Sequence, residues 1–410
     1  MTRTNTARVP ARAAAKEAAS EALSAFAAYP HDAVPGTGRP ADPGPAILAT
    51  LVAGGDRPAR GDPAALALAA WLRPMRTGML HAGLFGGGGL AGCYVGSHIA
   101  SSTWPDLGPL AASLRSMQTK HAVSRPWALH EVGWTDYDLM TGPSGILLAL
   151  SCDPACPPFC MAPVVAHLTA LCDDDRLGRL RVGAYRDEAL RGWNHGRINT
   201  GLAHGVTGVA AALRAAGELA GPSHALTSAM RRVADWLTAE SYTDTRGVLT
   251  WTCAGTEGRR PPAEASPRQA WCYGTPGITW TLWEIGRVLG APGLQSIART
   301  AFASFVAAYD ETFYLDAGAD EGTTRLDGLG LCHGAAGLLL LADAFARHAK
   351  VPGAAELRDH LERHLLDHLG EAVEFSETDP SLLSGSCGIL AALLTLHTGD
   401  RRWLPCVALR

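Results

Sequence analysis

Leu331-Cys332-His333-Gly334-Ala335-Ala336-Gly337-Leu338 is the stretch from which the fold of this chain can be worked out. Two glycines three residues apart lead into an apolar run, which is typical of a buried helix. Directly before the first glycine, Cys332 and His333 place a thiol beside an imidazole. Zn²⁺ takes sulfur and nitrogen ligands and needs three or four of them. The pair therefore indicates part of a metal site whose other ligands come from elsewhere.

The Gly-x-x-Gly signature of this stretch recurs along the chain, and an apolar segment follows it. Successive copies are roughly fifty to seventy residues apart, which is longer than the common helical repeats. The glycines fit tight loops at one end of a layer of helices, where backbones crowd and a positive φ can be needed. The copies are Gly86–Gly89 with Gly92, Gly142–Gly145, Gly205–Gly208, Gly274–Gly277, Gly334–Gly337 and Gly385–Gly388.

A second kind of helix, amphipathic and charged on one face, is predicted between the copies. Seven such segments precede seven apolar ones, if Pro45–Val52 is counted as the first apolar helix. Half-exposed helices that alternate with buried ones indicate an all-α fold, an α/α toroid (barrel) with about seven inner and seven outer helices. We expect residues 1–410 to form a single domain. The amphipathic segments are Ala11–Ala28, Ala64–Arg76, Leu107–Met117, Met161–Cys172, Ala225–Glu240, Leu294–Tyr309 and Ala354–Leu369.

Two segments do not fit the alternation and predict small irregular insertions. Residues 151–200 carry Pro154, Pro157, Pro158 and a polar, Arg-rich run, and residues 242–269 combine a β-prone stretch with a Gly- and Pro-containing loop. Both lead directly into loops that carry the glycine signature. They are interpreted either as lids or peptide-binding walls, or as plain long connections.

Composition excludes several classes of protein. The 410 residues carry 35 basic and 39 acidic side chains, a net charge of −4, which gives no support for a nucleic-acid-binding surface. Ten cysteines in a chain of this length do not indicate a disulfide scaffold. The N-terminal region has no signal-peptide core, and no segment of about twenty apolar residues predicts a transmembrane helix. We expect a cytoplasmic protein, and association with a membrane through partner proteins stays open.

The positions at or just before the glycines concentrate reactive side chains. If all inner helices begin at the same end of the toroid, these side chains meet at one mouth. They are Asp138, His204, Arg268, Cys272, Tyr273, Cys332 and His333.

Cys272, Cys332 and His333 make a ligand set of two sulfurs and one nitrogen. Three protein ligands and one open position are the arrangement of a catalytic zinc. Such a zinc can bind a substrate thiol and hold it as a thiolate at neutral pH. His204 then remains as a general acid/base, because imidazole titrates near pH 7.

The residues alone leave the other roles open. Asp138 either orients the site and balances its charge or caps the following helix, and Asp136 is a competing candidate. Arg268 either acts in the site or forms a structural salt bridge. Tyr273 either acts in the site or packs against its neighbours.

The strings GLAHG, WCYGTPG and LCHGAAG, with YDLMTGPSG upstream, resemble the lanthionine synthetase C-like (LanC) family of stand-alone lantibiotic cyclases. The resemblance extends from about Gly83 to Leu396 and implies an α/α toroid. It also implies Zn²⁺ on Cys272, Cys332 and His333, an acid/base histidine at His204 and an active-site aspartate at Asp138. The family's arginine four residues before the motif cysteine falls on Arg268, and its motif tyrosine falls on Tyr273; both are candidate catalytic residues.

The resemblance also implies a reaction, the Michael addition of a precursor-peptide cysteine to dehydroalanine or dehydrobutyrine, which forms lanthionine or methyllanthionine. The expected partners are a dehydrated precursor peptide with leader and core, a dehydratase and a transporter, with no nucleic acid. Two alternatives stay open. A LanC-like enzyme could add glutathione or another thiol to dehydroamino acids, or the chain could be a non-catalytic peptide-binding scaffold of a biosynthetic complex.

Overall fold

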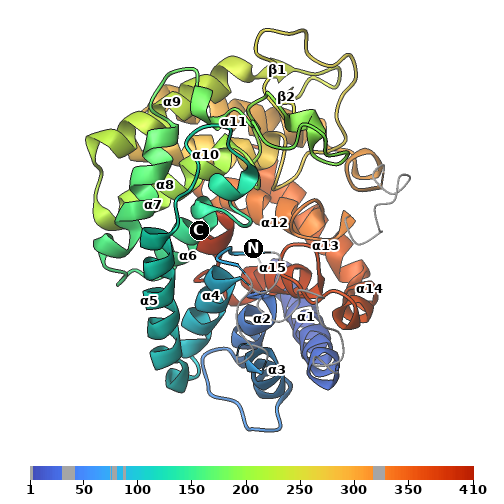
Figure 1. Cartoon of the computed structure of the whole chain (residues 1–410). Helices are drawn as coiled ribbons and strands as arrows, with labels where there is room; N and C mark the ends of the chain where they lie inside the picture. The colour runs from blue at the N-terminus through green and yellow to red at the C-terminus, as the bar shows by residue number, and fades with distance from the viewer. Residues whose placement is uncertain (1–2, 30–41, 74, 76–80, 86–88, 317–327) are drawn as a thin grey trace.

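The structure is a computed structural model that describes residues 3–29, 42–73, 75, 81–85, 89–316 and 328–410. Its main feature is a ring of inner helices surrounded by outer helices (Figure 1). The inner helices are α2 (Gly44–Ala53), α4 (Leu90–Ser101), α6 (Pro143–Ser151), α8 (Val206–Ala220), α10 (Thr275–Val288), α12 (Ala335–Ala344) and α15 (Ser386–Thr398). The outer helices are α1 (Arg3–Ala28), α3 (Pro63–Leu72), α5 (Gly108–Ser124), α7 (Pro158–Leu171), α9 (His224–Glu240), α11 (Pro292–Ala307) and α13 (Ala354–Asp367), followed by the short α14 (Leu369–Glu374).

The smaller elements lie in the connections. They are η3 (Pro105–Leu107), η4 (Trp134–Asp136), η5 (Gly178–Leu180), η6 (Gly192–Asn194), β1 (Tyr242–Thr243), β2 (Leu249–Thr250), η7 (Thr312–Asp316), η10 (Phe345–Ala349), η11 (Phe375–Glu377) and η12 (Leu404–Val407). β1 and β2 pair antiparallel within the predicted insertion of residues 242–269. In the other predicted insertion, residues 151–200, the first half contains α7, and residues 172–200 form the irregular part, which includes the helical turns η5 and η6.

The inner helices close a ring. Each packs against the next in chain order from α2 to α15, and α15 packs against α2. Each inner helix from α2 to α12 also packs on the outer helix that follows it. The predicted α/α toroid of seven inner and seven outer helices is therefore confirmed.

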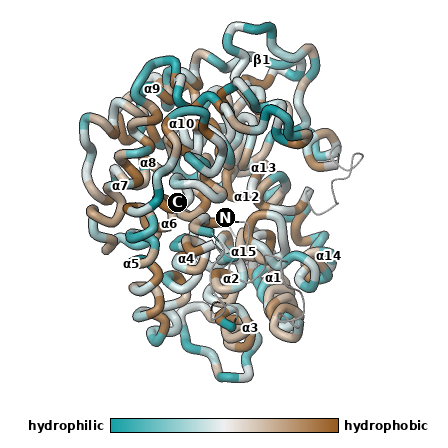
Figure 2. The backbone as a smooth tube through the Cα atoms, in the orientation of Figure 1, coloured by the Kyte–Doolittle hydropathy of each residue, from teal (hydrophilic) through white to brown (hydrophobic). Residues whose placement is uncertain are grey.

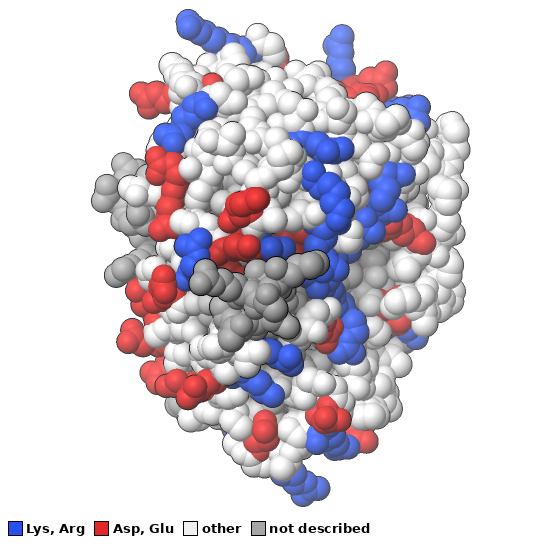
Figure 3. All heavy atoms as spheres, turned by 180° about the vertical axis from the view of Figure 1, so that it is seen from behind, with Lys and Arg blue, Asp and Glu red and all other residues white. Residues whose placement is uncertain are grey.

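Hydropathy follows this arrangement, with apolar residues toward the interior and hydrophilic residues concentrated in the outer loops (Figure 2). All ten residues of α12 are buried, whereas the outer helix α13 buries only Ala354, Leu357, Leu361 and Leu365. On the face shown in Figure 3, both basic and acidic side chains lie at the surface, as the polar faces of amphipathic outer helices predict. Among the described residues, no helix combines the length and apolarity that crossing a bilayer needs.

The repeated glycines are needed for close packing. A Cβ on the second glycine of five copies would lie 1.8 to 2.3 Å from the carbonyl oxygen six residues earlier, at Gly145, Gly208, Gly277, Gly337 and Gly388. The expected positive φ occurs among the first glycines only at Gly274, where φ is 78°. The other first glycines have negative φ, at Gly142, Gly205, Gly334 and Gly385. The crowding prediction is thus confirmed, and the φ prediction holds for one copy; Gly86–Gly88 lie outside the described residues.

Backbone hydrogen bonds join the loops that precede the inner helices, which we call the mouth loops. Leu139 N donates to Ala203 O at 3.0 Å, and Leu202 N donates to Cys272 O at 2.7 Å. Cys272 N donates to Cys332 O at 3.3 Å, and Cys332 N to Leu383 O at 2.8 Å. From the mouth loop before α6 to the one before α15, each loop is thus tied to the next, so their side chains are held at fixed relative positions.

The C-terminal segment packs in the interior of the toroid. Helical turn η12 lies against α6, and Cys406, Val407 and Leu409 are almost fully buried. Two buried indoles of inner-layer residues donate to its carbonyls: Trp271 Nε1 to Val407 O at 2.9 Å and Trp280 Nε1 to Ala408 O at 3.2 Å.

Candidate active site

Three side chains that the sequence analysis proposed as metal ligands lie together at the mouth. The ligand atoms of Cys272, Cys332 and His333 are all within 4.8 Å of one another. Both cysteines are buried, and His333 is half-buried. Two thiolates on one tetrahedral zinc are about 3.8 Å apart, so the cluster has the dimensions of such a site. Among the described residues, no further His, Cys, Asp or Glu joins this cluster.

The two thiols have very different proton affinities. A hydrogen bond from Cys272, with further help from His333, holds the pKa of Cys332 well below its usual range. Burial raises the pKa of Cys272 well above its usual range, and Arg268 acts in the opposite direction. The hydrogen bond between the two thiols therefore favours loss of a proton from Cys332. A donor set of two cysteine sulfurs and an imidazole fits a soft divalent ion such as Zn²⁺.

A histidine and a carboxylate form a second unit of the site. His204 Nδ1 lies 2.7 Å from Asp138 Oδ2, although 66 residues separate them. The Asp138 side chain is 1% exposed, whereas that of His204 is 24% exposed. The other carboxylate oxygen, Asp138 Oδ1, accepts hydrogen bonds from Thr141 N at 2.9 Å and Gly142 N at 2.8 Å. The carboxylate is thus fixed by its own loop and orients the imidazole.

Asp136, the competing candidate, lies elsewhere. Its carboxylate accepts from Gly133 N at 2.8 Å and Ala128 N at 3.1 Å, within its own loop. It therefore shapes the loop that carries Asp138, and the structure brings only Asp138 to His204.

Arg268 and Tyr273 occupy different surroundings. Arg268 is exposed at the mouth, and its guanidinium forms no ion pair with any described residue. Tyr273 is buried, and its hydroxyl accepts from Asn199 Nδ2 at 2.9 Å. Burial also raises the pKa of the Tyr273 phenol, which keeps it neutral. Tyr273 thus packs under the loop that leads to His204, whereas Arg268 is accessible from solvent.

Trp134 is part of the site that sequence reasoning missed. Its indole stacks on the His204 imidazole, with ring centroids 4.1 Å apart and an interplanar angle of 20°. Trp134 O accepts from Asp138 N at 2.7 Å, so one loop holds the histidine by its edge and its face. No sequence pattern marked this residue, because the contact spans 70 residues and does not recur in other repeats.

Sequence reasoning also missed Asn199 and Gln269, although a repeated sequence pattern could have identified Asn199. Asn199 Oδ1 accepts from Gly201 N at 2.8 Å, and Asp379 Oδ1 accepts from Ser381 N at 2.9 Å. Both residues stand six positions before the first glycine of their copy. A comparison of the copies at that offset would have found this repeated turn. Gln269 Oε1 accepts from Thr275 N at 2.7 Å at the start of α10.

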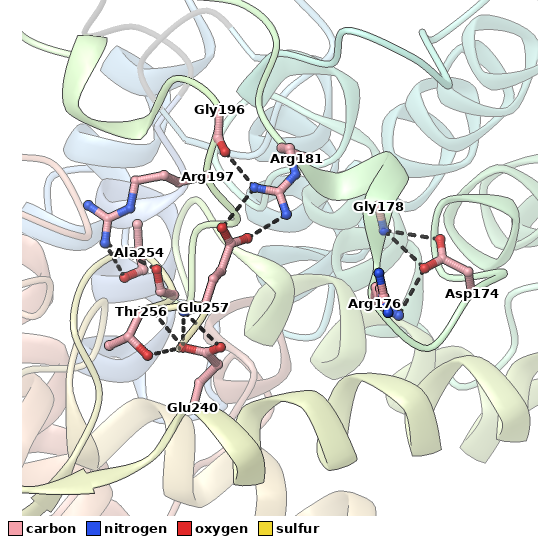
Figure 4. A network of polar contacts seen from close by, with 11 residues as sticks. Asp174, Arg176, Gly178, Arg181, Gly196, Arg197, Glu240, Ala254, Thr256 and Glu257 are labelled. Atoms are coloured by element: carbon pink, nitrogen blue, oxygen red, sulfur yellow. Dashed lines mark hydrogen bonds and ion pairs between the residues drawn. The ribbon is translucent and has the colours of Figure 1, made fainter. Parts of the chain in front are cut away.

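The insertions beside the mouth are braced against each other (Figure 4). Arg181 pairs with Glu257 at 2.6 Å, and Arg197 donates to Ala254 O at 2.9 Å. Glu240, at the end of α9, accepts from Thr256 Oγ1 at 2.7 Å. The loop that ends at His204 is therefore held by the insertion of residues 242–269.

The fold and the site define an α/α toroid with two cysteines and a histidine clustered at its mouth. A family model for lanthionine synthetase C-like proteins matches residues 63–409, and the chain belongs to this family. Among solved structures, nisin cyclase is similar in fold, with a TM-score of 0.69 and 19% sequence identity. That match covers 91% of this chain and 93% of the nisin cyclase chain. A search of curated proteins found no match.

Proposed function

We propose that the chain is a zinc-dependent peptide cyclase that forms lanthionine or methyllanthionine. Its substrate is a dehydrated precursor peptide, in which a cysteine adds to a dehydroalanine or dehydrobutyrine. The observation that carries this proposal is that Cys272, Cys332 and His333 lie at the same mouth as the His204–Asp138 pair. Membership of the lanthionine synthetase C-like family supports it.

The metal ligands in this proposal are Cys272, Cys332 and His333. Bound Zn²⁺ would supply a Lewis acid that lowers the pKa of a substrate thiol and keeps the sulfur nucleophilic at neutral pH. The mouth loops hold the three ligands in place through the Cys272–Cys332 and Cys332–Leu383 backbone hydrogen bonds.

The proposed role of His204 is to move one proton. Because Nδ1 faces the Asp138 carboxylate, Nδ1 carries a hydrogen and Nε2 is the nitrogen free to exchange a proton. Nε2 accepts the proton of the substrate thiol. The sulfur then bonds to the β-carbon, the π pair moves to the α-carbon, and Nε2 returns the proton there. Atoms and charge balance, and the product is an isomer of the substrate.

Asp138 is the proposed positioning group, since it fixes the tautomer of His204 and stabilises the imidazolium between the two transfers. Arg268, which is accessible and unpaired among the described residues, is proposed to attract the carbonyl oxygen on which enolate charge develops. For Tyr273 we propose support of the His204 loop through Asn199.

The experiment combines metal analysis with a count of free thiols, because ring closure does not change the mass. We expect Cys332→Ala to lose most bound zinc and to form no thioether with a dehydroalanine- and cysteine-containing peptide. Cys387→Ala is the matched control, since Cys387 is another buried cysteine within a glycine signature and lies outside the cluster. Full zinc content and full ring formation in Cys332→Ala would overturn the proposal. Thioether formation only with added glutathione would favour the alternative thiol-adding enzyme.

A further inference from the structure

The irregular segment before His204 presents apolar side chains to solvent next to the site. Leu190 is 88% exposed and Trp193 is 42% exposed. Both side chains belong to the segment of residues 185–193. We call this segment, together with Trp134, the mouth wall. Large exposed apolar side chains that cluster beside a site, instead of occurring singly, mark a binding surface.

The mouth wall is continuous with the candidate active site. Trp134 stacks on His204, and its backbone N donates to the Tyr185 hydroxyl at 2.8 Å. The rings of Trp134 and Tyr185 meet edge to face, with centroids 5.5 Å apart. Arg191 lies over the Tyr185 ring at 4.3 Å. Contacts thus connect His204, through Trp134 and Tyr185, to Arg191, which is the residue next to Leu190.

The wall is held in one conformation. Tyr185 has φ of 71°, an uncommon backbone state for an aromatic residue, which persists only where the surroundings enforce it. Trp193 Nε1 donates to Leu190 O at 3.1 Å and closes the turn that carries both exposed side chains. A surface that is ordered before binding loses less conformational entropy when a ligand docks.

The charges of residues 185–193 sum to zero, since Arg186 and Arg191 are offset by Asp187 and Glu188, so the wall favours no charged ligand. Arg191 is paired with Glu188 at 2.5 Å, and its guanidinium already stacks on Tyr185. The large apolar side chains that the wall exposes are those of Leu190 and Trp193. Tryptophan, tyrosine and arginine are also the residues that dominate binding energy at protein interfaces.

We propose that the mouth wall binds an apolar side chain of the substrate peptide, adjacent to the cysteine that closes the ring. This choice of ligand rests on the proposed function, because a substrate peptide that contacts both the metal ligands and His204 would continue past the mouth wall. The wall then selects peptides with a leucine, isoleucine, valine or phenylalanine beside the reacting cysteine.

The test measures binding of two synthetic peptides to the zinc-loaded full chain by fluorescence anisotropy. Both contain cysteine, with alanine in place of dehydroalanine so that no ring forms, and they differ by phenylalanine or serine beside the cysteine. We expect the phenylalanine peptide to bind about tenfold more tightly, because the wall buries its ring. The double variant Leu190→Ser/Trp193→Ser is expected to bind both peptides equally.

Phe159→Ser is the matched control, since Phe159 is 69% exposed on the outer helix α7. It should keep the wild-type preference. A preference that persists in the double variant, or that is absent from the wild type, overturns the inference. The inference is also overturned if light scattering shows a dimer for the wild type and a monomer for the double variant. The wall would then contact a second copy of the chain.

Cyclisation assays separate this inference from the proposed function. The same two peptides with dehydroalanine restored are incubated with the wild-type chain. Ring formation without any difference between the peptides would refute the wall and leave the cyclase proposal intact. A clear binding preference without any ring formation would refute the cyclase proposal and leave the peptide-binding wall intact.

Discussion

At the scale of single residues, neighbouring side chains fix the orientation of His204. Asp138 holds the edge of His204, and Trp134 covers its face. The indole Nε1 of Trp134 is buried and has no hydrogen-bond partner among the described residues, which costs stability. The stack on His204 accounts for an aromatic side chain at this position despite that cost.

If His204 is the proposed general acid/base, Trp134→Ala should lower kcat for ring formation about tenfold, because an imidazole that can rotate is less often aligned. Trp134→Phe keeps an aromatic face and should retain kcat within about threefold. Rates come from free-thiol counts over time, and zinc content and thermal unfolding are measured in parallel. Equal losses of kcat in both variants would show that the stack does not position His204.

At the scale of elements, the step from mouth loop to inner helix repeats with one steric requirement. The second glycine of each Gly-x-x-Gly lies against the carbonyl that begins its own mouth loop. At Gly337 this carbonyl belongs to Leu331, the neighbour of Cys332, and a Cβ would lie 2.0 Å from the oxygen. The requirement links helix packing directly to the placement of a proposed metal ligand.

Gly337→Ala is accordingly expected to lower the free energy of unfolding by about 3 kcal/mol, because backbone must move to admit the methyl group. Gly293→Ala is the control: this glycine is in α11, and a Cβ there meets nothing within 4 Å. It should leave stability unchanged or raise it by up to about 1 kcal/mol. Urea denaturation provides both values. A tolerated methyl group at Gly337 would contradict the packing argument.

At the scale of the whole molecule, one buried carboxylate closes the series of mouth loops. Asp42 Oδ1 accepts from Leu382 N at 2.7 Å and from Gly44 N at 2.8 Å. It thereby connects the loop before α15 to the start of α2, at the junction of the last and first repeats. Burial raises the pKa of Asp42 to about 7, and the two backbone donors oppose this rise.

The raised pKa predicts how stability depends on pH. Between pH 4 and pH 7 the folded chain holds a proton on Asp42 that the unfolded chain, with its pKa near 3.8, releases. This contribution to stability is fully present below pH 4 and is lost as pH rises toward 7, at up to about 1.4 kcal/mol per pH unit. Asp42→Asn cannot titrate and should flatten the pH dependence of the free energy of unfolding.

Urea denaturation at pH 5, 6, 7 and 8 provides the measurement. Asp62→Asn is the control, because Asp62 also accepts a backbone N–H, from Ala64 N at the start of α3, but is less buried. Its pH dependence should match the wild type. If Asp42→Asn keeps the wild-type slope, Asp42 does not carry the proton.

Much of the architecture was predictable because its causes are local. Hydrophobic periodicity separates buried helices from half-exposed ones within a few turns, and glycine marks the crowded start of each inner helix. These two signals place α8, α10 and α12 and predict that Cys332 and His333 stand at a mouth. The role of Asp138 was harder to predict from the sequence, because Asp136 carries the same carboxylate two residues away. Only packing decides which of the two carboxylates faces His204.

The sequence by itself determined the alternation of helices, the glycine-marked mouth and the residue types gathered there, since each depends on neighbours along the chain. The tertiary structure alone decided the partners from different repeats: Trp134 on the face of His204, Asn199 on the Tyr273 hydroxyl, and Asp42 between the first and last repeats. The physical reason is that a closed ring brings together residues up to 340 positions apart. Contacts of that kind depend on how the helices pack, and no local pattern encodes them.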